Sequence, residues 1–220
     1  EMGLGKTILM IGCIRHNFKQ RTLVVVPPSL LSQWVAVFKR FLGHTPFVYR
    51  GSAAKNVTIE NLAQKPIVLT TYGMITPRGK GNKRSFSKLH GLQWSRIIYD
   101  EAHHVRNLTT SVHAGAAELK ADIRGMVTGT PINNRITDLY ALCRVIGLAE
   151  VFTPNKEEIK KLLGIHLLRR TKTQVGIKLP PVNTEVIEVD WSSESEEDMA
   201  AQVHAMMHFT GVNHGNVDQL

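Results

Sequence analysis

Residues 1–7 read Glu1-Met2-Gly3-Leu4-Gly5-Lys6-Thr7, and they lead into an apolar pattern that predicts a helix over residues 6–18. A glycine-rich turn that opens a helix lets backbone N–H groups surround phosphate oxygens, and the helix N-terminus adds a favourable dipole. In this pattern the lysine reaches the β- and γ-phosphates, and the threonine hydroxyl binds Mg²⁺. The short stretch alone could be an accidental turn. Read as a phosphate loop, it predicts nucleotide contacts from Gly3, Leu4, Gly5, Lys6 and Thr7.

Apolar runs of strand length alternate with helix-length patterns after this loop, which is typical of βαβ units around a parallel sheet. We expect buried strands at residues 23–26, 67–70, 96–99 and 125–128. We expect helices at residues 29–41, with Ser29 as N-cap, and at 111–119, 136–146, 156–173 and 193–209, with a further strand at 182–191. The glycine-rich basic segment 77–87 reads as a flexible insertion. The fold class is therefore α/β.

Two adjacent carboxylates, Asp100 and Glu101, follow the apolar run Ile97-Ile98-Tyr99. Open α/β sheets bind ligands at the carboxyl ends of their strands. Asp100 is suited to hold Mg²⁺ together with Thr7, and Glu101 to orient and deprotonate the water that attacks the γ-phosphate. An acidic loop after a strand is the simpler alternative, but the upstream glycine-rich loop makes it much the weaker. Thr128, Gly129 and Thr130 end another strand in the same way, where hydroxyls can sense the γ-phosphate.

Composition excludes several classes of protein. The 220 residues are 43% hydrophobic and 20% charged, as in a folded globular protein, and no apolar run approaches the ~20 residues of a membrane-spanning helix. The two cysteines are far apart, so we expect no disulfide framework and an intracellular protein. The formal charge is +9, and residues 61–99 hold seven basic side chains and no acidic one. Such a field attracts nucleic acid, although charge alone fits an ordinary basic surface equally well.

Five motifs together resemble the Swi/Snf-type DNA-dependent ATPases of the superfamily-two helicase-like translocases. They are EMGLGKT, VVPPSLLSQW, IVLTTYGMI, IIYDEAHHVRN and MVTGTPINNRITDLYAL, and HLLRRTKTQV follows them. The resemblance covers nearly the whole chain. It implies a RecA-like parallel sheet with flanking helices in residues 1–148, and a helical protrusion in residues 149–220 that leads towards a second lobe.

The resemblance also implies ATP and Mg²⁺ as cofactors, double-stranded DNA or nucleosomes as partners, and a nuclear location. Lys6, Asp100 and Glu101 would be catalytic, while His103 and the loop 128–130 would couple nucleotide state to DNA. The residues expected to face DNA, some through backbone amides, are Pro27, Pro28, Ser29, Thr70, Thr71, Tyr72, Asn133 and Asn134.

The strand that leads into the phosphate loop and the second lobe with its arginine fingers are not in this sequence. We therefore expect exposed sheet edges and weak or no ATP turnover from these 220 residues alone. Two alternatives stay open. One is a naturally truncated module that binds nucleic acid or a partner, and the other is a restriction-type or other superfamily-two motor.

Overall fold

The strands in the described part of the chain form one parallel sheet of five with the order β2-β3-β1-β4-β5. The computed structural model describes residues 1, 3–79, 83–129, 136–177, 180, 183–187 and 191–209. β1 pairs with β3 on one side and β4 on the other, and every residue of β1 and β3 is buried, as a parallel sheet covered on both faces requires. The strand bounds are β1 Thr22–Val26, β2 Phe47–Tyr49, β3 Ile67–Thr71, β4 Gln93–Asp100 and β5 Lys120–Val127.

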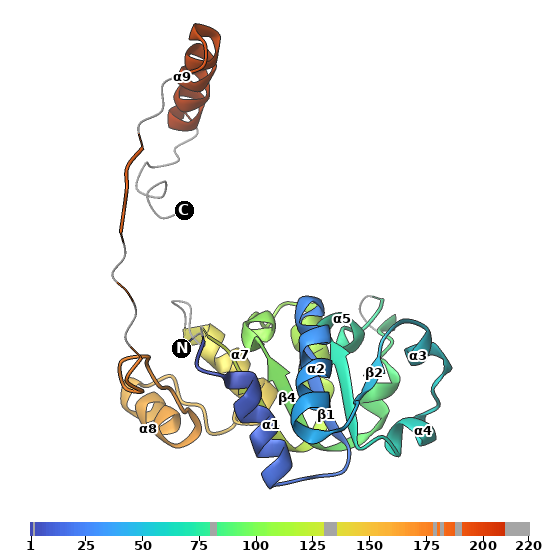
Figure 1. Cartoon of the computed structure of the whole chain (residues 1–220). Coiled ribbons are helices and arrows are strands. Elements are labelled where there is room, and N and C mark those ends of the chain that lie inside the picture. The colour runs from blue at the N-terminus through green and yellow to red at the C-terminus, as the bar shows by residue number, and fades with distance from the viewer. Residues whose placement is uncertain are drawn as a thin grey trace. The chain divides into compact units, whose positions relative to one another are not determined.

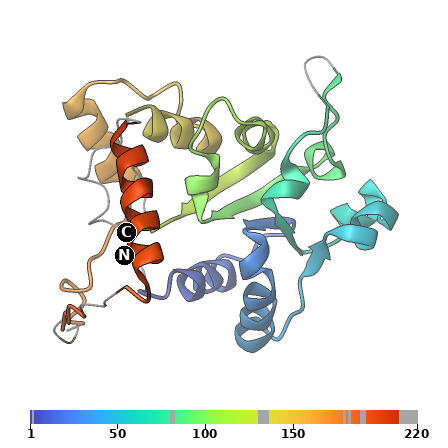
Figure 2. The ribbon, with the colours of Figure 1, turned by 90° about the horizontal axis from the view of Figure 1, so that it is seen from above.

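Helices cover both faces of the sheet (Figure 1). Alternate residues of β1 point to opposite faces, so Val24 packs in one apolar cluster with Ile11 and Trp34, while Val25 packs in another with Ile75. Figure 2 shows the blue helices α1 and α2 on one side of the strands and the green and yellow helices α6 and α7 on the other. The α-helices of the sheet domain are α1 Lys6–His16, α2 Leu31–Leu42, α3 Gly51–Asn56, α4 Ile59–Ala63, α5 Tyr72–Ile75, α6 Ser111–Glu118, α7 Ile136–Ile146 and α8 Lys156–His166.

The four expected strands are confirmed, and the expected set is incomplete. β2 has three residues, too few for a periodic pattern, so sequence reasoning missed it. β5 starts five residues before the apolar run that predicted it, because this edge strand exposes part of its length, including Ile123. β5 has one neighbour among the described strands and so lies at one side of the sheet.

The expected helices are confirmed with changed ends. Ser29 does not cap α2, because a short 3₁₀ turn, η1 (Pro28–Leu30), comes first and α2 has Leu30 at its N-cap. The helix expected over 156–173 ends at His166. Short 3₁₀ turns η3 (Lys88–Gly91) and η4 (Ala102–Val105) flank β4. No helix among the described residues is long and apolar enough to cross a bilayer.

The chain divides into two compact units, residues 1–177 and 178–220. The first contains the sheet. The second contains α9 (Glu194–Phe209), which confirms the helix expected there and has acidic residues in its first turn. Residues 183–187 are not in a strand, contrary to the expectation for 182–191; residues 182 and 188–190 lie outside the described set.

The basic segment before β4 contains one lysine that the fold already uses. Lys88 Nζ donates to the carbonyls of Lys55 at 2.8 Å and Val57 at 2.7 Å, at the C-terminal end of α3. Arg78 and Ser85 exchange two backbone hydrogen bonds and close the base of the expected insertion, whose residues 80–82 lie outside the described set. The hydrogen bonds from Lys88 stabilise the C-terminal end of α3, where a cation is favourable.

Candidate active site

The carboxyl ends of four parallel strands lie along one edge of the sheet. The register places Val26 opposite Thr71 and Asp100 opposite Val127. The segments that follow these strands therefore begin side by side at this edge of the sheet. Among the described residues they contain Pro27, Pro28, Ser29, Tyr72, Glu101, Thr128 and Gly129. The sequence prediction that Asp100 and the residues after Val127 share this edge agrees with the register.

The glycine-rich loop has the backbone conformation that an anion site needs. Gly3 has φ 82° and Gly5 has φ 68°, both in the left-handed region that side chains other than glycine rarely adopt. Gly5 is the N-cap of α1, and it has no side chain to cap the N–H groups of the first turn. Those donors point out of the helix end and carry its positive dipole. Donors and a dipole of this kind favour a bound anion such as phosphate.

Lys6, the first residue of α1, lines the same cavity as Thr128 and Gly129, which follow β5. Its Nζ donates to the Glu1 carbonyl at 3.0 Å, so the ammonium folds over the loop. Burial raises the pKa of the Asp100 carboxyl, and the positive charge of Lys6 is the smallest of the effects that oppose this rise. Thr7, one residue further, is half-buried.

Three hydrogen bonds fix Asp100, which is 4% exposed. The Trp34 indole N–H donates to Oδ2 at 2.7 Å, and the Glu101 amide donates to Oδ1 at 3.0 Å. The Tyr72 hydroxyl donates to the backbone carbonyl at 2.6 Å. Burial raises the pKa of the Asp100 carboxyl, and the hydrogen bonds from Trp34 and Glu101 oppose that rise. The sequence pattern around Trp34 fits a core residue or one that stacks on bases, and it gave no sign of this contact with a carboxylate.

Glu101 is held in a strained backbone conformation, with φ 49° and ψ 52°. Positive φ at a residue other than glycine is uncommon and often marks a functional position; among the described residues Arg21 shares it. Glu101 Oε2 lies 3.2 Å from His103 Nδ1, within ion-pair range but without hydrogen-bond alignment. The side chain of Glu101 is 23% exposed, which leaves it open to water.

The rings of His103, His104 and Tyr72 pack against one another beside Glu101. The His103 and His104 rings stack with centroids 4.5 Å apart, and the His104 ring lies 5.0 Å from that of Tyr72. Burial, and then the neighbouring His103, lower the pKa of His104, which favours the neutral ring at neutral pH. The stack thus joins the segment after β3 to the carboxylates after β4. The sequence offered no role for His104.

The sequence predicts Mg²⁺ bound together with a nucleotide, and this stays a prediction. The described residues contain no group of three or more His, Cys, Asp or Glu side chains able to hold a metal ion. Magnesium typically takes one or two protein ligands and completes its shell with phosphate oxygens and water. The two predicted oxygen ligands lie in the first turn of α1, for Thr7, and at the end of β4, for Asp100.

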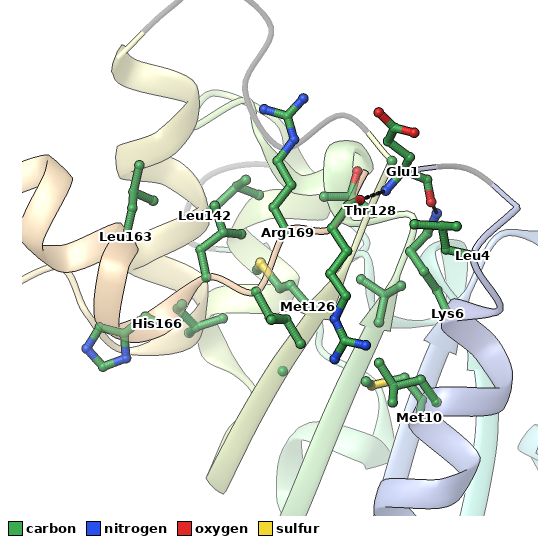
Figure 3. Close-up of a pocket in the computed structure, with 18 of the residues that line it drawn as sticks. Glu1, Leu4, Lys6, Met10, Met126, Thr128, Leu142, Leu163, His166 and Arg169 are labelled. Atoms are coloured by element: carbon green, nitrogen blue, oxygen red, sulfur yellow. Dashed lines mark hydrogen bonds between the residues drawn. The ribbon is translucent and has the colours of Figure 1, made fainter. Parts of the chain in front are cut away.

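A cavity of about 670 Å³ borders the phosphate loop on its other side (Figure 3). Its lining is largely apolar and comes from α1, β5, α7, α8 and the segment after α8; Leu4, Met126 and Leu163 are examples. The cavity lining does not include the two carboxylates. The LRRTK segment, residues 168–172, packs on the loop: the Glu1 nitrogen donates to the Arg170 carbonyl at 3.0 Å, and the Lys172 amide donates to Glu1 Oε2 at 2.8 Å.

The residues expected to face DNA differ in how exposed their side chains are and in whether their hydroxyls already form hydrogen bonds. Pro28 and Ser29 are exposed. Thr70 is fully buried and its hydroxyl donates to the Tyr49 carbonyl at 2.9 Å, while the Tyr72 hydroxyl is used by Asp100. Thr71 is 4% exposed, so a contact from this segment would have to use the backbone. Thr130, Asn133 and Asn134 lie outside the described residues, and the DNA contacts stay a prediction.

The sequence matches a family model described as the SNF2-related domain over residues 1–215. Among similar proteins, a "Probable global transactivator" of Orgyia pseudotsugata multicapsid polyhedrosis virus is 32% identical over 203 residues, which are 86% of this chain and 40% of that protein. The "CHD3-type chromatin-remodeling factor CHR7" of Arabidopsis thaliana is 32% identical over 221 residues, 90% of this chain and 18% of that protein. This chain thus spans less than half the length of either relative.

A solved structure has the same fold. It is described as "Sulfolobus solfataricus SWI2/SNF2 ATPase core in complex with dsDNA", and it superposes with a TM-score of 0.65 at 29% identity. The superposition covers 80% of this chain and 40% of the other. The sheet and its flanking helices are therefore RecA-like, as the sequence predicted.

Proposed function

We propose, from the premise that this chain belongs to the SNF2-related domain family, that it is the first ATP-binding lobe of a DNA-dependent ATPase that translocates on double-stranded DNA. The observation that carries the proposal is the meeting of two chemistries at one sheet edge. Two observations support it: Lys6, which follows the glycine-lined start of α1, shares a cavity with Thr128 and Gly129, and these follow the strand that pairs with β4 and its buried Asp100. Such an arrangement suits a magnesium-bound triphosphate.

The roles follow from the chemistry of each group. Backbone amides from Gly3 to Thr7 and the Lys6 ammonium bind the phosphates. Asp100 and Thr7 hold the magnesium, which when bound neutralises charge on the transferring phosphoryl group. Glu101 orients the attacking water and accepts its proton, because it is the carboxylate open to solvent. His103, at 3.2 Å from Glu101, couples that carboxylate to the DNA side of the lobe.

Double-stranded DNA is the polymer we assign to this lobe. The related Sulfolobus ATPase core was solved with double-stranded DNA, and the chain carries a net charge of +9. DNA would lie along the carboxyl edge, over Pro28, Ser29 and the backbone from Thr70 to Tyr72; Asn133 and Asn134, outside the described residues, stay expected contacts. Similarity to remodelling and repair proteins favours chromatin remodelling or DNA repair in the nucleus. Residues 149–220 would lead to a second lobe that completes the catalytic site.

The test is Glu101→Gln in the complete protein. This variant should bind ATP as the wild type does and lose DNA-stimulated hydrolysis by about 10²-fold or more, since a positioned base typically contributes 10²–10⁴. Glu118→Gln is the matched control: it makes the same chemical change at an exposed position at the end of α6 and should leave hydrolysis unchanged. Full DNA-stimulated hydrolysis by Glu101→Gln would refute the assignment. A wild-type protein that binds DNA but no ATP would favour a binding module.

A further inference from the structure

Trp34 is the largest fully buried side chain on the face of the sheet that α1 and α2 cover, yet its polar atom meets a carboxylate. Its indole N–H lies 2.7 Å from Asp100 Oδ2, and 66 positions separate the two residues in sequence. The other buried tryptophan, Trp94, gives its N–H to the Leu89 carbonyl, as a core residue does. If Trp34 only filled space in the core, a backbone carbonyl would be an equally good acceptor for its indole N–H.

The bond from Trp34 completes the restraint on one carboxylate. Asp100 Oδ1 already accepts from the Glu101 amide at 3.0 Å, so the two oxygens are held by two elements, α2 and the turn after β4. The Tyr72 hydroxyl holds the backbone carbonyl of the same residue. With both oxygens anchored, the carboxylate cannot rotate about its terminal torsion. Each oxygen keeps a further lone pair for a metal ion.

We propose that Trp34 is a positioning residue that orients the Asp100 carboxylate for magnesium; this rests on the proposed function of the site. Asp100 is nearly inaccessible to water, so no solvent donor replaces the indole N–H when it is lost. The carboxylate then turns towards another donor and presents the wrong lone pair to the metal. A side chain in α2, well outside the phosphate loop and the acidic pair, thereby sets the metal affinity.

The experiment compares Trp34→Phe with Phe38→Leu in the complete protein. Phe38 lies one turn further along α2, is fully buried, and packs on Trp34 with ring centroids 5.7 Å apart, and its side chain has no N–H to donate to a carboxylate. Both variants lose apolar packing, and only the first loses the donor. The measurement is the Mg²⁺ concentration that gives half-maximal tightening of ATP binding, determined by calorimetry, alongside the midpoint of urea unfolding.

Trp34→Phe should require about tenfold more Mg²⁺, the loss expected for a hydrogen bond to a charged group. Phe38→Leu should keep the wild-type Mg²⁺ requirement even where its unfolding midpoint falls equally. An unchanged requirement in Trp34→Phe, or an equal shift in both variants, overturns the inference. ATP binding by the wild type that ignores Mg²⁺ would refute the proposed function itself. If Trp34→Phe does not fold, the indole N–H resonance of Trp34 in the wild type must shift when Mg²⁺ is added to the ATP complex; an unmoved resonance overturns the inference.

Discussion

Two glycine-to-alanine changes in the first twelve residues should have opposite effects. Gly5 has φ 68° and Gly12 lies inside α1 on its exposed side; an added Cβ meets no atom within 4 Å at either position. The added methyl group therefore meets no steric clash at either position, and the backbone φ angle determines the effect of each change. A left-handed alanine costs about 1–2 kcal/mol, whereas alanine in a helix interior is favoured over glycine by about 1 kcal/mol.

Gly5→Ala should weaken ATP binding by roughly five- to thirtyfold, because the strain must be met whenever the loop takes the binding conformation. Gly12→Ala should leave the affinity unchanged and raise the free energy of unfolding by about 0.5–1 kcal/mol. Calorimetric titration of each variant with Mg²⁺ and ATP, and urea unfolding followed by circular dichroism, give the two quantities. An affinity of Gly5→Ala within twofold of wild type would refute the reasoning about the loop.

Two further changes test the packing around the site. Gly115→Ala in α6 should lower the free energy of unfolding, measured in urea, by about 1–3 kcal/mol, because the added Cβ would clash with the Ile75 carbonyl oxygen. Helix propensity alone predicts a gain in stability, and such a gain would contradict this reasoning. His113 is 1% exposed and burial lowers its pKa, so the unfolded state binds the proton more readily and stability falls as pH drops below about 6.5. His113→Asn, which does not titrate, should lose less stability between about pH 7.5 and about pH 5.5; an identical loss would argue against this source of acid sensitivity.

Local patterns predicted the parts of the site that depend on neighbouring residues. The loop from Gly3 to Thr7 and the pair Asp100 and Glu101 are short stretches whose chemistry can be read in place. The alternation of apolar segments placed these stretches at strand and helix ends, which predicted that they lie at the carboxyl edge of the sheet. β2 was missed because three residues are too few for a periodic pattern, and the start of β5 was missed because it is polar.

Contacts between distant residues could not be predicted in this way. Trp34 and Tyr72 reach Asp100 across 66 and 28 positions, and nothing in their own segments distinguishes a hydrogen-bonded side chain from core. Lys88 belongs to a basic run that suggests phosphate binding, yet the fold uses it at the end of α3. Such assignments depend on which elements become neighbours, and only the folded chain determines that.

The account depends on one metal ion lying between the start of α1 and the end of β4. Iron-mediated cleavage measures this directly: Fe²⁺ replaces Mg²⁺ in the complete protein, and ascorbate with peroxide cuts the backbone beside the metal. In the presence of ATP we expect cuts at two places, near Thr7 and near Asp100, and neither cut when excess Mg²⁺ competes. Cleavage at only one of the two segments, or cleavage that does not depend on ATP, would contradict a shared nucleotide site.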